Sequence, residues 1–255
     1  MKQERVTIIA ELGINHLGNI EIAKQMIDGA KECGANLVKL QKREINRVYS
    51  QEELDKPRES PFGTTNRKLK EQLEFDENEW NILVDYTRKK GLDIFASAWD
   101  LDSVKFLEKY DFKYNKIASA LLTHLELCEA IAKQGKYTFI STGMSTIEEI
   151  TKVVLLFRKY TCPIELLHCN SEYPTPLENL NLLCIPYLQK LYNCNVGLSD
   201  HSSEVIVPAY AVALGATSIE KHLTLDRAMY GSDQAASLAL AGFKKMVEYV
   251  RISEF

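Results

Sequence analysis

Short runs of β-branched and other apolar residues alternate along the chain with longer stretches whose apolar residues recur at helical spacing. The short runs predict eight strands, near residues 6–11, 36–41, 92–97, 114–119, 137–141, 164–168, 195–199 and 217–221. The longer stretches predict a helix after each strand, over residues 20–32, 76–90, 101–109, 123–134, 146–160, 177–191, 203–213 and 238–252. Eight β-α units in about 250 residues predict an α/β protein with the (β/α)8 TIM-barrel fold, as a single domain over residues 1–255.

Signals at the helix ends agree with this alternation. Residues 145–149 read Ser-Thr-Ile-Glu-Glu, which is typical of a capped helix start with acidic residues in the first turn. Glycines that commonly stop a helix follow four of the predicted helices, at Gly34, Gly91, Gly135 and Gly215. The alternative fold, a doubly wound open sheet, needs a Gly-x-Gly-x-x-Gly motif after the first strand, and Gly13 and Gly18 do not form one.

One insertion interrupts the pattern, between the second strand and its helix. Residues 43–72 are polar, mixed in charge and contain the turn-like Pro61-Phe62-Gly63. Loops of this length in a compact domain are usually functional or mobile. Two interpretations are equally open: a lid over the catalytic face, or a surface loop without a role in the site.

Composition and charge are those of a soluble globular protein, with 45% hydrophobic and 26% charged residues. A net charge of -4 gives no reason to expect a nucleic-acid partner. The sequence has no run of about 18 apolar residues and no apolar stretch at its start, so we expect neither a membrane span nor a signal peptide. The six cysteines form no Cys-x-x-Cys pair and are expected to be reduced, which predicts a cytoplasmic protein.

Residues capable of chemistry stand where the predicted strands end. The carboxyl ends of parallel barrel strands meet on one face, which holds the active site in essentially every known TIM-barrel enzyme. We therefore expect one cleft to collect residues from both halves of the chain: Glu11, Lys39, Gln41, Lys116, Ser119, Ser141, His168, Ser199, His201, Glu220 and His222.

His201 and His222 end neighbouring strands and are candidate metal ligands. Two imidazoles leave coordination positions open for water and substrate oxygens, as a catalytic metal requires. Such a nitrogen-and-water site suits Mn²⁺, Zn²⁺ or Fe²⁺ better than Ca²⁺. Since a lone histidine is more often structural, the spacing by itself leaves a metal site and a metal-free site equally open.

Lys39 and Lys116 predict an anion in the cleft, because a lysine at a barrel rim is costly to desolvate without one. Hydroxyl donors that fit phosphate or carboxylate recognition follow other strands, at Ser119, Ser141 and Ser199. Two alternatives stay open: a Schiff-base lysine, which needs an isolated apolar pocket, and simple pairing of the lysines with Glu11 or Glu220. Those two carboxylates are also candidate acid/base groups, ionised beside lysines or protonated in an apolar wall.

Three further polar residues stand in predicted loops. Tyr173 begins the rigid turn Tyr-Pro-Thr-Pro, which fixes its side chain at low entropy. Asp233 follows the last barrel strand and could accept a hydrogen bond from a sugar hydroxyl. His16 is expected to organise the first loop.

Several motifs, taken together and in this order, resemble the sialic acid synthase family. They lie at residues 8–16, 38–41, 116–119, 141–145, 167–169, 173–176, 197–201 and 220–227. A series of motifs across the whole chain is far more specific than any single one. The resemblance implies a TIM-barrel enzyme that condenses phosphoenolpyruvate with the aldehyde of an N-acetylated hexosamine such as N-acetylmannosamine. The products would be a nine-carbon 2-keto acid of the sialic acid type and phosphate.

The resemblance also implies a role for each candidate residue. A divalent metal, Mn²⁺ or Mg²⁺, would be held by His201 and His222 and would polarise the sugar aldehyde. Glu11 would be an acid/base group toward the water that attacks C2, with Lys116 and His222 also in the catalytic set. Phosphoenolpyruvate would be bound by Lys39, Lys116, Ser119, Ser141 and Ser199. The aminosugar would be faced by Gln41, Tyr173, Glu220 and Asp233.

The sequence departs from the family pattern in four places, one of which is residues 169–172, just before Tyr173. Residues 95–100 replace the usual Ser-Thr-Pro-Phe, which predicts the loss of a hydroxyl near phosphoenolpyruvate, and Leu121 replaces a carboxylate near the sugar. These changes predict a modified hexosamine or a different aldose as acceptor.

The chain stops at Phe255, where the family continues into a small antifreeze-like domain. The resemblance also implies a homodimer. The alternatives are a Schiff-base aldolase or lyase acting through Lys116, and a non-catalytic sugar-binding subunit.

Overall fold

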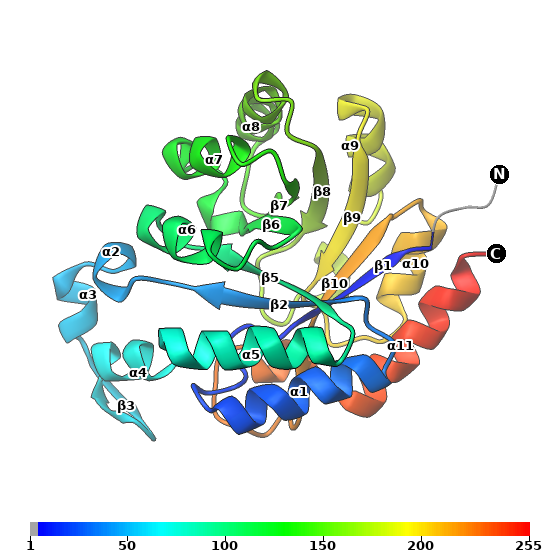
Figure 1. The fold of residues 1–255 in the computed structure, drawn as a ribbon. Coiled ribbons are helices and arrows are strands. Elements are labelled where there is room, and N and C mark those ends of the chain that lie inside the picture. Colours follow the sequence, from blue (N-terminus) through cyan, green and yellow to red (C-terminus); the bar gives the residue numbers. More distant parts are fainter. Residues whose placement is uncertain (1–4) are drawn as a thin grey trace.

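A computed structural model describes residues 5–255 and confirms the (β/α)8 TIM barrel (Figure 1). The barrel strands are β1 (Thr7–Glu11), β2 (Leu37–Lys42), β5 (Asp93–Ala98), β6 (Tyr114–Ile117), β7 (Tyr137–Ser141), β8 (Ile164–Cys169), β9 (Asn195–Asp200) and β10 (Ser218–Thr224). They pair in parallel in chain order, and β10 pairs with β1 to close the ring. A short strand, β11 (Leu238–Ala239), adds to β10. Each barrel strand lies where the hydrophobic pattern predicts one.

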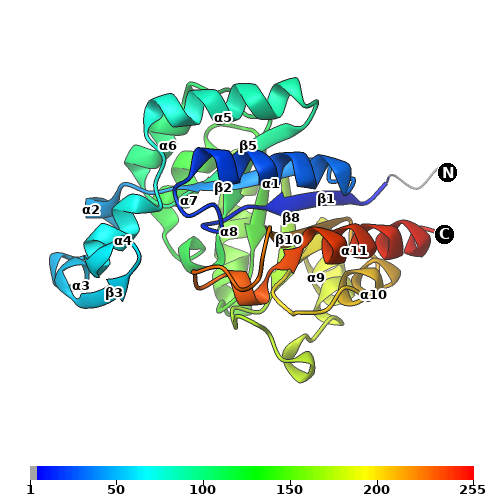
Figure 2. The ribbon, with the colours of Figure 1, turned by 90° about the horizontal axis from the view of Figure 1, so that it is seen from below.

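A layer of helices surrounds the strands (Figures 1 and 2). It contains α1 (Ile20–Glu32), α5 (Glu77–Lys89), α6 (Leu101–Glu108), α7 (Leu125–Ala132), α8 (Ile147–Lys159), α9 (Cys184–Tyr192), α10 (Val207–Ala213) and α11 (Leu240–Ser253). Thr146 and Glu149 form the capping box of α8, as predicted. The four glycines predicted to end helices all have positive φ angles, between 66° and 99°. No helix within residues 5–255 has the length and apolar character needed to cross a membrane.

Two helices begin later than the sequence pattern predicts. The predicted helix 177–191 is a 3-10 turn, η2 (Leu177–Asn179), followed by α9 from Cys184, because Asn181 has a left-handed φ of 46° between them. The predicted helix 203–213 begins only at Val207. The segment before it is held in turns by side chains that bind nearby backbone amides, which competes with helix formation.

The long insertion is folded. It contains α2 (Ile45–Val48), α3 (Gln51–Asp55), the hairpin β3 (Pro57–Ser60) and β4 (Gly63–Thr65), and α4 (Asn66–Gln72). It lies beyond the carboxyl end of β2 and projects to one side of the barrel (Figures 1 and 2). Phe62 at the hairpin turn meets the ring of Tyr230 edge-on, with centroids 6.2 Å apart. The insertion therefore touches the loop that follows β10.

The side chains inside the barrel differ between its two ends. Aromatic rings of β5, β6 and β7 pack on one another with centroids 5.4 to 6.1 Å apart, from Phe95, Tyr114, Tyr137 and Phe139. Charged side chains are buried at the carboxyl ends, at Glu11, Lys39, Lys116 and Glu220. Lys39 pairs in register with Phe95, and Lys116 with Phe139, so the charged layer rests directly beside the aromatic one.

Candidate active site

A pocket opens at the carboxyl ends of the barrel strands, with about 680 Å³ of space including its mouth. The structure brings most of the sequence-predicted site residues to its walls: Glu11, Lys39, Gln41, Lys116, Ser119, Ser141, Tyr173, Ser199, His201, Glu220 and His222. They come from strand ends and the loops that follow them all around the ring, from β1 at the start of the chain to β10 near its end. Strand closure thus assembles the cleft from single residues at strand ends.

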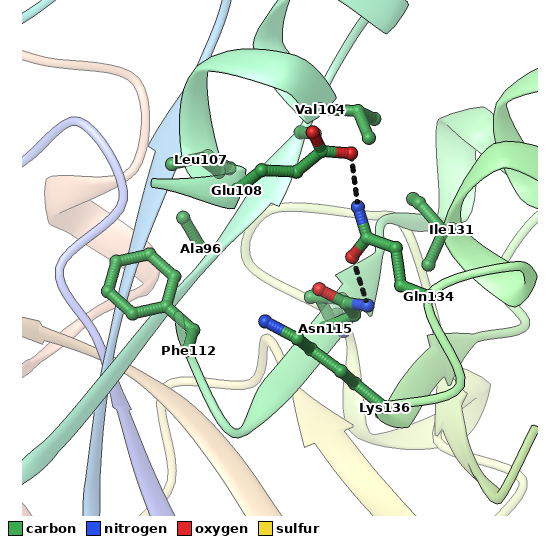
Figure 3. A pocket seen from close by; sticks show the side chains of 11 residues that line it. Ala96, Val104, Leu107, Glu108, Phe112, Asn115, Ile131, Gln134 and Lys136 are labelled. Atoms are coloured by element: carbon green, nitrogen blue, oxygen red, sulfur yellow. Dashed lines mark hydrogen bonds between the residues drawn. The ribbon is translucent and has the colours of Figure 1, made fainter. Parts of the chain in front are cut away.

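A second pocket on the outer side of the barrel has a different character (Figure 3). It lies between α6, α7 and the strands β5 and β6, and its polar side chains bind one another. Asn115 Nδ2 donates to Gln134 Oε1 at 2.9 Å, and Gln134 Nε2 donates to Glu108 Oε1 at 3.3 Å. These hydrogen bonds hold the helices against the strands, which indicates a structural role for this pocket. The reactive side chains gather instead in the pocket at the strand ends.

Two lysines and two carboxylates form a buried cluster at the floor of that pocket. Glu220 Oε1 accepts from Lys116 Nζ at 3.2 Å and from Ser199 Oγ at 3.0 Å, and lies 3.5 Å from Lys39 Nζ. Lys39 Nζ is also 2.9 Å from Glu11 Oε2, and Lys116 donates to the Ser141 hydroxyl. Each lysine therefore has a carboxylate partner, which was one of the open alternatives.

The two carboxyl groups of the cluster titrate in opposite directions. Burial raises the pKa of Glu11 from 4.5 to about 7, although Lys39 opposes this. Burial also disfavours the charged form of Glu220, but Lys116 and Lys39 outweigh it and lower the pKa of Glu220 to about 2. Burial opposes the charged form of Lys39, but Glu11 and Glu220 outweigh it and raise the pKa of Lys39, whereas burial lowers the pKa of Lys116. An incoming anion would favour the charged form of both lysines, so the cluster suits an anion.

Both oxygens of Glu11 are oriented by neighbours. Lys39 lies at Oε2, and Gln41 Nε2 donates to Oε1 at 2.8 Å. Arg43 in turn donates to Gln41 Oε1, and its guanidinium stacks 4.4 Å above the ring of Trp99. The carboxyl group is therefore held in one place while its proton remains exchangeable near pH 7.

The two histidines stand side by side on the opposite wall, with ring centroids 5.5 Å apart. His201 Nδ1 lies 2.6 Å from the carbonyl oxygen of Asn170; because a carbonyl only accepts, Nδ1 carries the proton. His201 Nε2 is then an acceptor, and the Tyr173 hydroxyl donates to it at 2.7 Å. The ring of Tyr173 also stacks on His201 at 3.9 Å.

His222 is buried, and burial lowers its pKa, so its imidazole is neutral. Its Nδ1 has no hydrogen-bond partner among residues 5–255 and lies 3.8 Å from Asp233 Oδ2. Gly13, at a φ of +52°, lets the first loop approach these two side chains; a Cβ atom there would come within 3.1 to 3.3 Å of both. The wall therefore offers two imidazoles whose remaining ring nitrogens, Nε2 of His201 and Nδ1 of His222, can act as acceptors.

The sequence matches the NeuB family over residues 26–255. The chain belongs to the NeuB family. This confirms the resemblance seen in the motifs, and with it the enzyme class, a phosphoenolpyruvate-dependent nonulosonic acid synthase.

Similar proteins cover nearly the whole chain. An uncharacterized protein of Methanocaldococcus jannaschii is 41% identical, over 99% of this chain and 72% of its own. A pseudaminic acid synthase of Campylobacter jejuni is 38% identical, over 98% of this chain and 74% of its own. The crystal structure of N-acetylneuraminic acid synthetase from Leptospira borgpetersenii, in complex with citrate, has a TM-score of 0.90 and 32% identity, and the match covers 98% of this chain and 84% of that one.

The histidine wall of this NeuB-family barrel fits a divalent metal with an incomplete protein shell. The partnerless Nδ1 of His222 and the acceptor Nε2 of His201 are the kind of donors that Mn²⁺ takes together with water and substrate oxygens. The carbonyl of Asn170 fixes the His201 tautomer, as groups behind a metal ligand commonly do. In the described part of the chain, no three His, Cys, Asp or Glu side chains gather into a metal-binding group, so further ligands would be water or substrate.

Some pocket residues of this NeuB-family chain were not predicted from the sequence: Ser97, Trp99, Met144 and Ser171. Ser97 is 1% exposed, and its hydroxyl is unpartnered within the described range. Strand register could have revealed it, because Ser97 stands opposite both Gln41 and Lys116. Cys169 also lines the pocket.

Other predicted residues lie outside the pocket wall. Asp233 stands behind His222. His168 is at a strand end, but its Nε2 lies 2.7 Å from the carbonyl oxygen of Leu180, away from the cleft. His16 Nδ1 accepts from the Gly18 amide, which fits the structural role expected for the first loop. Within residues 5–255 the insertion contributes no side chain to the pocket, so it stands beside the site and not over it.

Proposed function

We propose that this NeuB-family barrel condenses phosphoenolpyruvate with the open-chain aldehyde of an N-acetylated hexosamine or a related aldose. The product is a nine-carbon 2-keto sugar acid, with release of phosphate. The observation that supports this most is the division of one pocket into a lysine floor, formed by Lys39 and Lys116, and a histidine wall, with Glu11 between them.

Phosphoenolpyruvate is an anion with a phosphate and a carboxylate, and the floor suits both. Lys39 and Lys116 supply two buried amino groups that Glu220 keeps in position. Nearby hydroxyls supply neutral donors around them, at Ser119, Ser141 and Ser199.

Glu11 serves as the acid/base group. Its pKa of about 7 places the carboxyl between its two forms at neutral pH, where proton transfer is most effective. C3 of phosphoenolpyruvate forms a bond to the aldehyde carbon as the carbonyl π bond breaks, and water adds to C2 while Glu11 takes one of its protons. The aldehyde oxygen, now an alkoxide, takes up a proton and becomes a hydroxyl. The C2–O bond to phosphate then breaks, the second water proton leaves with the phosphate, and C2 becomes the ketone of the product.

His201 and His222 would hold Mn²⁺ or Mg²⁺, which when bound supplies a Lewis acid for the aldehyde oxygen. The protein's own contribution is the tautomer of His201, set by the Asn170 carbonyl, and the neutral state of His222, set by burial. The acceptor sugar would be faced by Gln41, Tyr173, Asp233 and the free oxygen of Glu220. Trp99, which lines the pocket, favours a modified hexosamine or a different aldose over N-acetylmannosamine.

Phosphate release from phosphoenolpyruvate tests the proposal directly. The assay uses Mn²⁺ and a panel of aldoses, with the His201→Ala/His222→Ala double variant and the exposed His124→Ala as a matched control. We expect release that requires both aldose and metal, that the double variant loses, and that His124→Ala keeps.

Three outcomes would count against parts of this proposal. No release with any aldose would contradict the synthase. A borohydride-trapped adduct on Lys116 would replace it with the Schiff-base aldolase. Fast turnover of N-acetylmannosamine alone would contradict the altered acceptor.

A further inference from the structure

A fully buried ion pair lies directly behind the two histidines, on the other side of the barrel wall. Lys221 Nζ is 2.5 Å from Asp200 Oδ2, and both side chains have 0% exposure. Successive residues of a strand point to opposite faces. The pocket is lined by the residues on either side of this pair, at Ser199, His201, Glu220 and His222, while Asp200 and Lys221 face the helical layer.

This pair joins the two histidine-bearing segments at one point. Asp200 and Lys221 stand opposite each other in the register of β9 and β10. Each precedes a histidine in the sequence, so the pair ties the backbone next to His201 to the backbone next to His222. Any change of spacing between these two strand ends would have to break it.

The same two side chains also fix the residue that follows His201. The Asp200 carboxylate accepts from the Ser202 amide at 2.9 Å and from the Ser202 hydroxyl at 3.0 Å. Lys221 Nζ donates to the Ser202 carbonyl oxygen at 2.6 Å. His201 is therefore held from both sides, between an anchored Asp200 and an anchored Ser202.

Stability alone is a weak reason for such a pair. Removing two charges from water costs about as much as their attraction returns, so an apolar pair of similar volume is often equally stable. An apolar pair, however, could not bind the amide, hydroxyl and carbonyl of Ser202. What the ion pair supplies in addition is a fixed backbone around His201.

We propose that Asp200 and Lys221 are positioning residues that hold His201 beside His222 in the one ring orientation that presents Nε2 to the pocket. The inference rests on the proposed function, in which both imidazoles act together. Lys221 touches no pocket atom, so it acts only through His201 and the strand spacing.

The decisive variant replaces both charges, Asp200→Leu/Lys221→Met, and so leaves no buried charge without a partner. The chain has five histidines, so ¹⁵N-histidine NMR of the metal-free protein can resolve His201, assigned by its loss in His201→Gln. In the wild type we expect His201 as a single tautomer with the proton on Nδ1. In the double variant we expect its two nitrogen shifts to converge, as both tautomers become populated.

Turnover gives a second readout. Losing a group that orients a metal ligand typically costs about 10- to 100-fold in activity, and we expect a fall of kcat in this range. The KM for phosphoenolpyruvate should stay near the wild-type value, because the lysine floor is unchanged. The matched control is Glu165→Gln, which alters a buried carboxylate at the opposite end of the barrel and should leave both the His201 tautomer and kcat unchanged.

A folded double variant with the wild-type His201 tautomer and wild-type kcat overturns the proposal. If the double variant does not fold, Ser202→Ala replaces it as the test, because it keeps both charges and removes the hydrogen bond from the Ser202 hydroxyl to Asp200. We then expect a smaller convergence of the two His201 nitrogen shifts. Unchanged nitrogen shifts in Ser202→Ala would overturn the inference. The tautomer is read without substrate or metal. A failure of the proposed synthase activity would therefore leave this test intact and stay distinguishable from it.

Discussion

The two ends of the barrel bury carboxylates in contrasting ways. At the amino end, Glu165 accepts from the hydroxyls of Thr217 and Ser218, each at 2.6 Å, and from Tyr137 at 2.7 Å. At the carboxyl end, Glu220 Oε2 and His222 Nδ1 are buried without a hydrogen-bond partner in the described residues. The amino end thus satisfies the hydrogen-bonding groups of Glu165 within the protein. The carboxyl end leaves Glu220 Oε2 and His222 Nδ1 free to bind a ligand.

This difference locates the site better than the size of the pockets does. The amino end also carries a pocket, with about 1090 Å³ of space against about 680 Å³ at the carboxyl end. Buried polar groups in folded proteins are nearly always bonded, so unbonded ones mark places that bind something else. By this criterion the amino end stabilises the fold, whereas the carboxyl end gives up stability for function.

The largest expected effect comes from Glu11→Gln. A glutamine keeps the shape and one acceptor oxygen but cannot take a proton, so we expect kcat to fall by about 10²- to 10⁴-fold. The KM for phosphoenolpyruvate should change little, since both lysines remain. Phosphate release under steady-state conditions measures this, with Glu165→Gln as the matched carboxylate at the other end. Equal losses of kcat in Glu11→Gln and Glu165→Gln would contradict the assignment of catalysis to the carboxyl end of the barrel alone.

The same substitution should change how stability depends on pH. The pKa of Glu11 is raised from 4.5 to about 7 on folding, so its contribution is fully present below pH 4.5 and is lost as the pH rises through about 7. Glu11→Gln lacks this loss. We therefore expect its free energy of unfolding to gain on the wild type by about 3 kcal/mol between pH 4.5 and pH 8.

Urea unfolding at several pH values from 5 upward measures this gain. That range avoids the titration of Glu220, whose pKa lies at about 2. Parallel pH profiles for Glu11→Gln and the wild type would show that burying this carboxyl costs no stability.

Glu165→Gln should do the reverse of Glu11→Gln. It replaces a carboxylate that accepts three hydroxyl hydrogen bonds, so we expect the free energy of unfolding to fall by about 1–3 kcal/mol. Catalysis should be unaffected, because the aromatic layer separates Glu165 from the pocket. Denaturant unfolding and phosphate release on the same preparation test both statements. A loss of activity without a loss of stability would mean that the amino end takes part in the reaction.

Much of this contrast could be read from the sequence. The position of each reactive residue at a strand end followed from the alternation of apolar runs and helical stretches, because closure of a parallel ring fixes which ends meet. The separate protonation of Glu11 and Glu220 could not be predicted. It depends on the number of lysines that each carboxylate contacts, since Glu220 lies within 3.5 Å of both Lys39 and Lys116 whereas Glu11 pairs with Lys39, and a one-dimensional pattern does not contain this.

Other misses have equally local causes. The late start of α10 results from side chains of Asp200 and Ser202 that bind backbone amides, a competition invisible to hydrophobic periodicity. Ser97 was overlooked because its strand ends in apolar and aromatic residues, and only the register with Gln41 and Lys116 brings its hydroxyl into the pocket. Tertiary pairing, more than local propensity, decided these points.

The smallest effect is expected at the rim, from Asp233→Asn. The Asp233 carboxylate lies 3.8 Å from His222 Nδ1 with its side chain 17% exposed, and a partly solvated charge of this kind contributes less than about 1 kcal/mol. If it accepts a sugar hydroxyl, the variant should raise the KM for the aldose less than about ten-fold and leave kcat unchanged. Asp226→Asn, in the same loop and exposed, is the control and should change neither constant. A fall in kcat at constant KM would instead mean that Asp233 orients His222. The functional carboxyl end of the barrel would then include a residue that does not line the pocket.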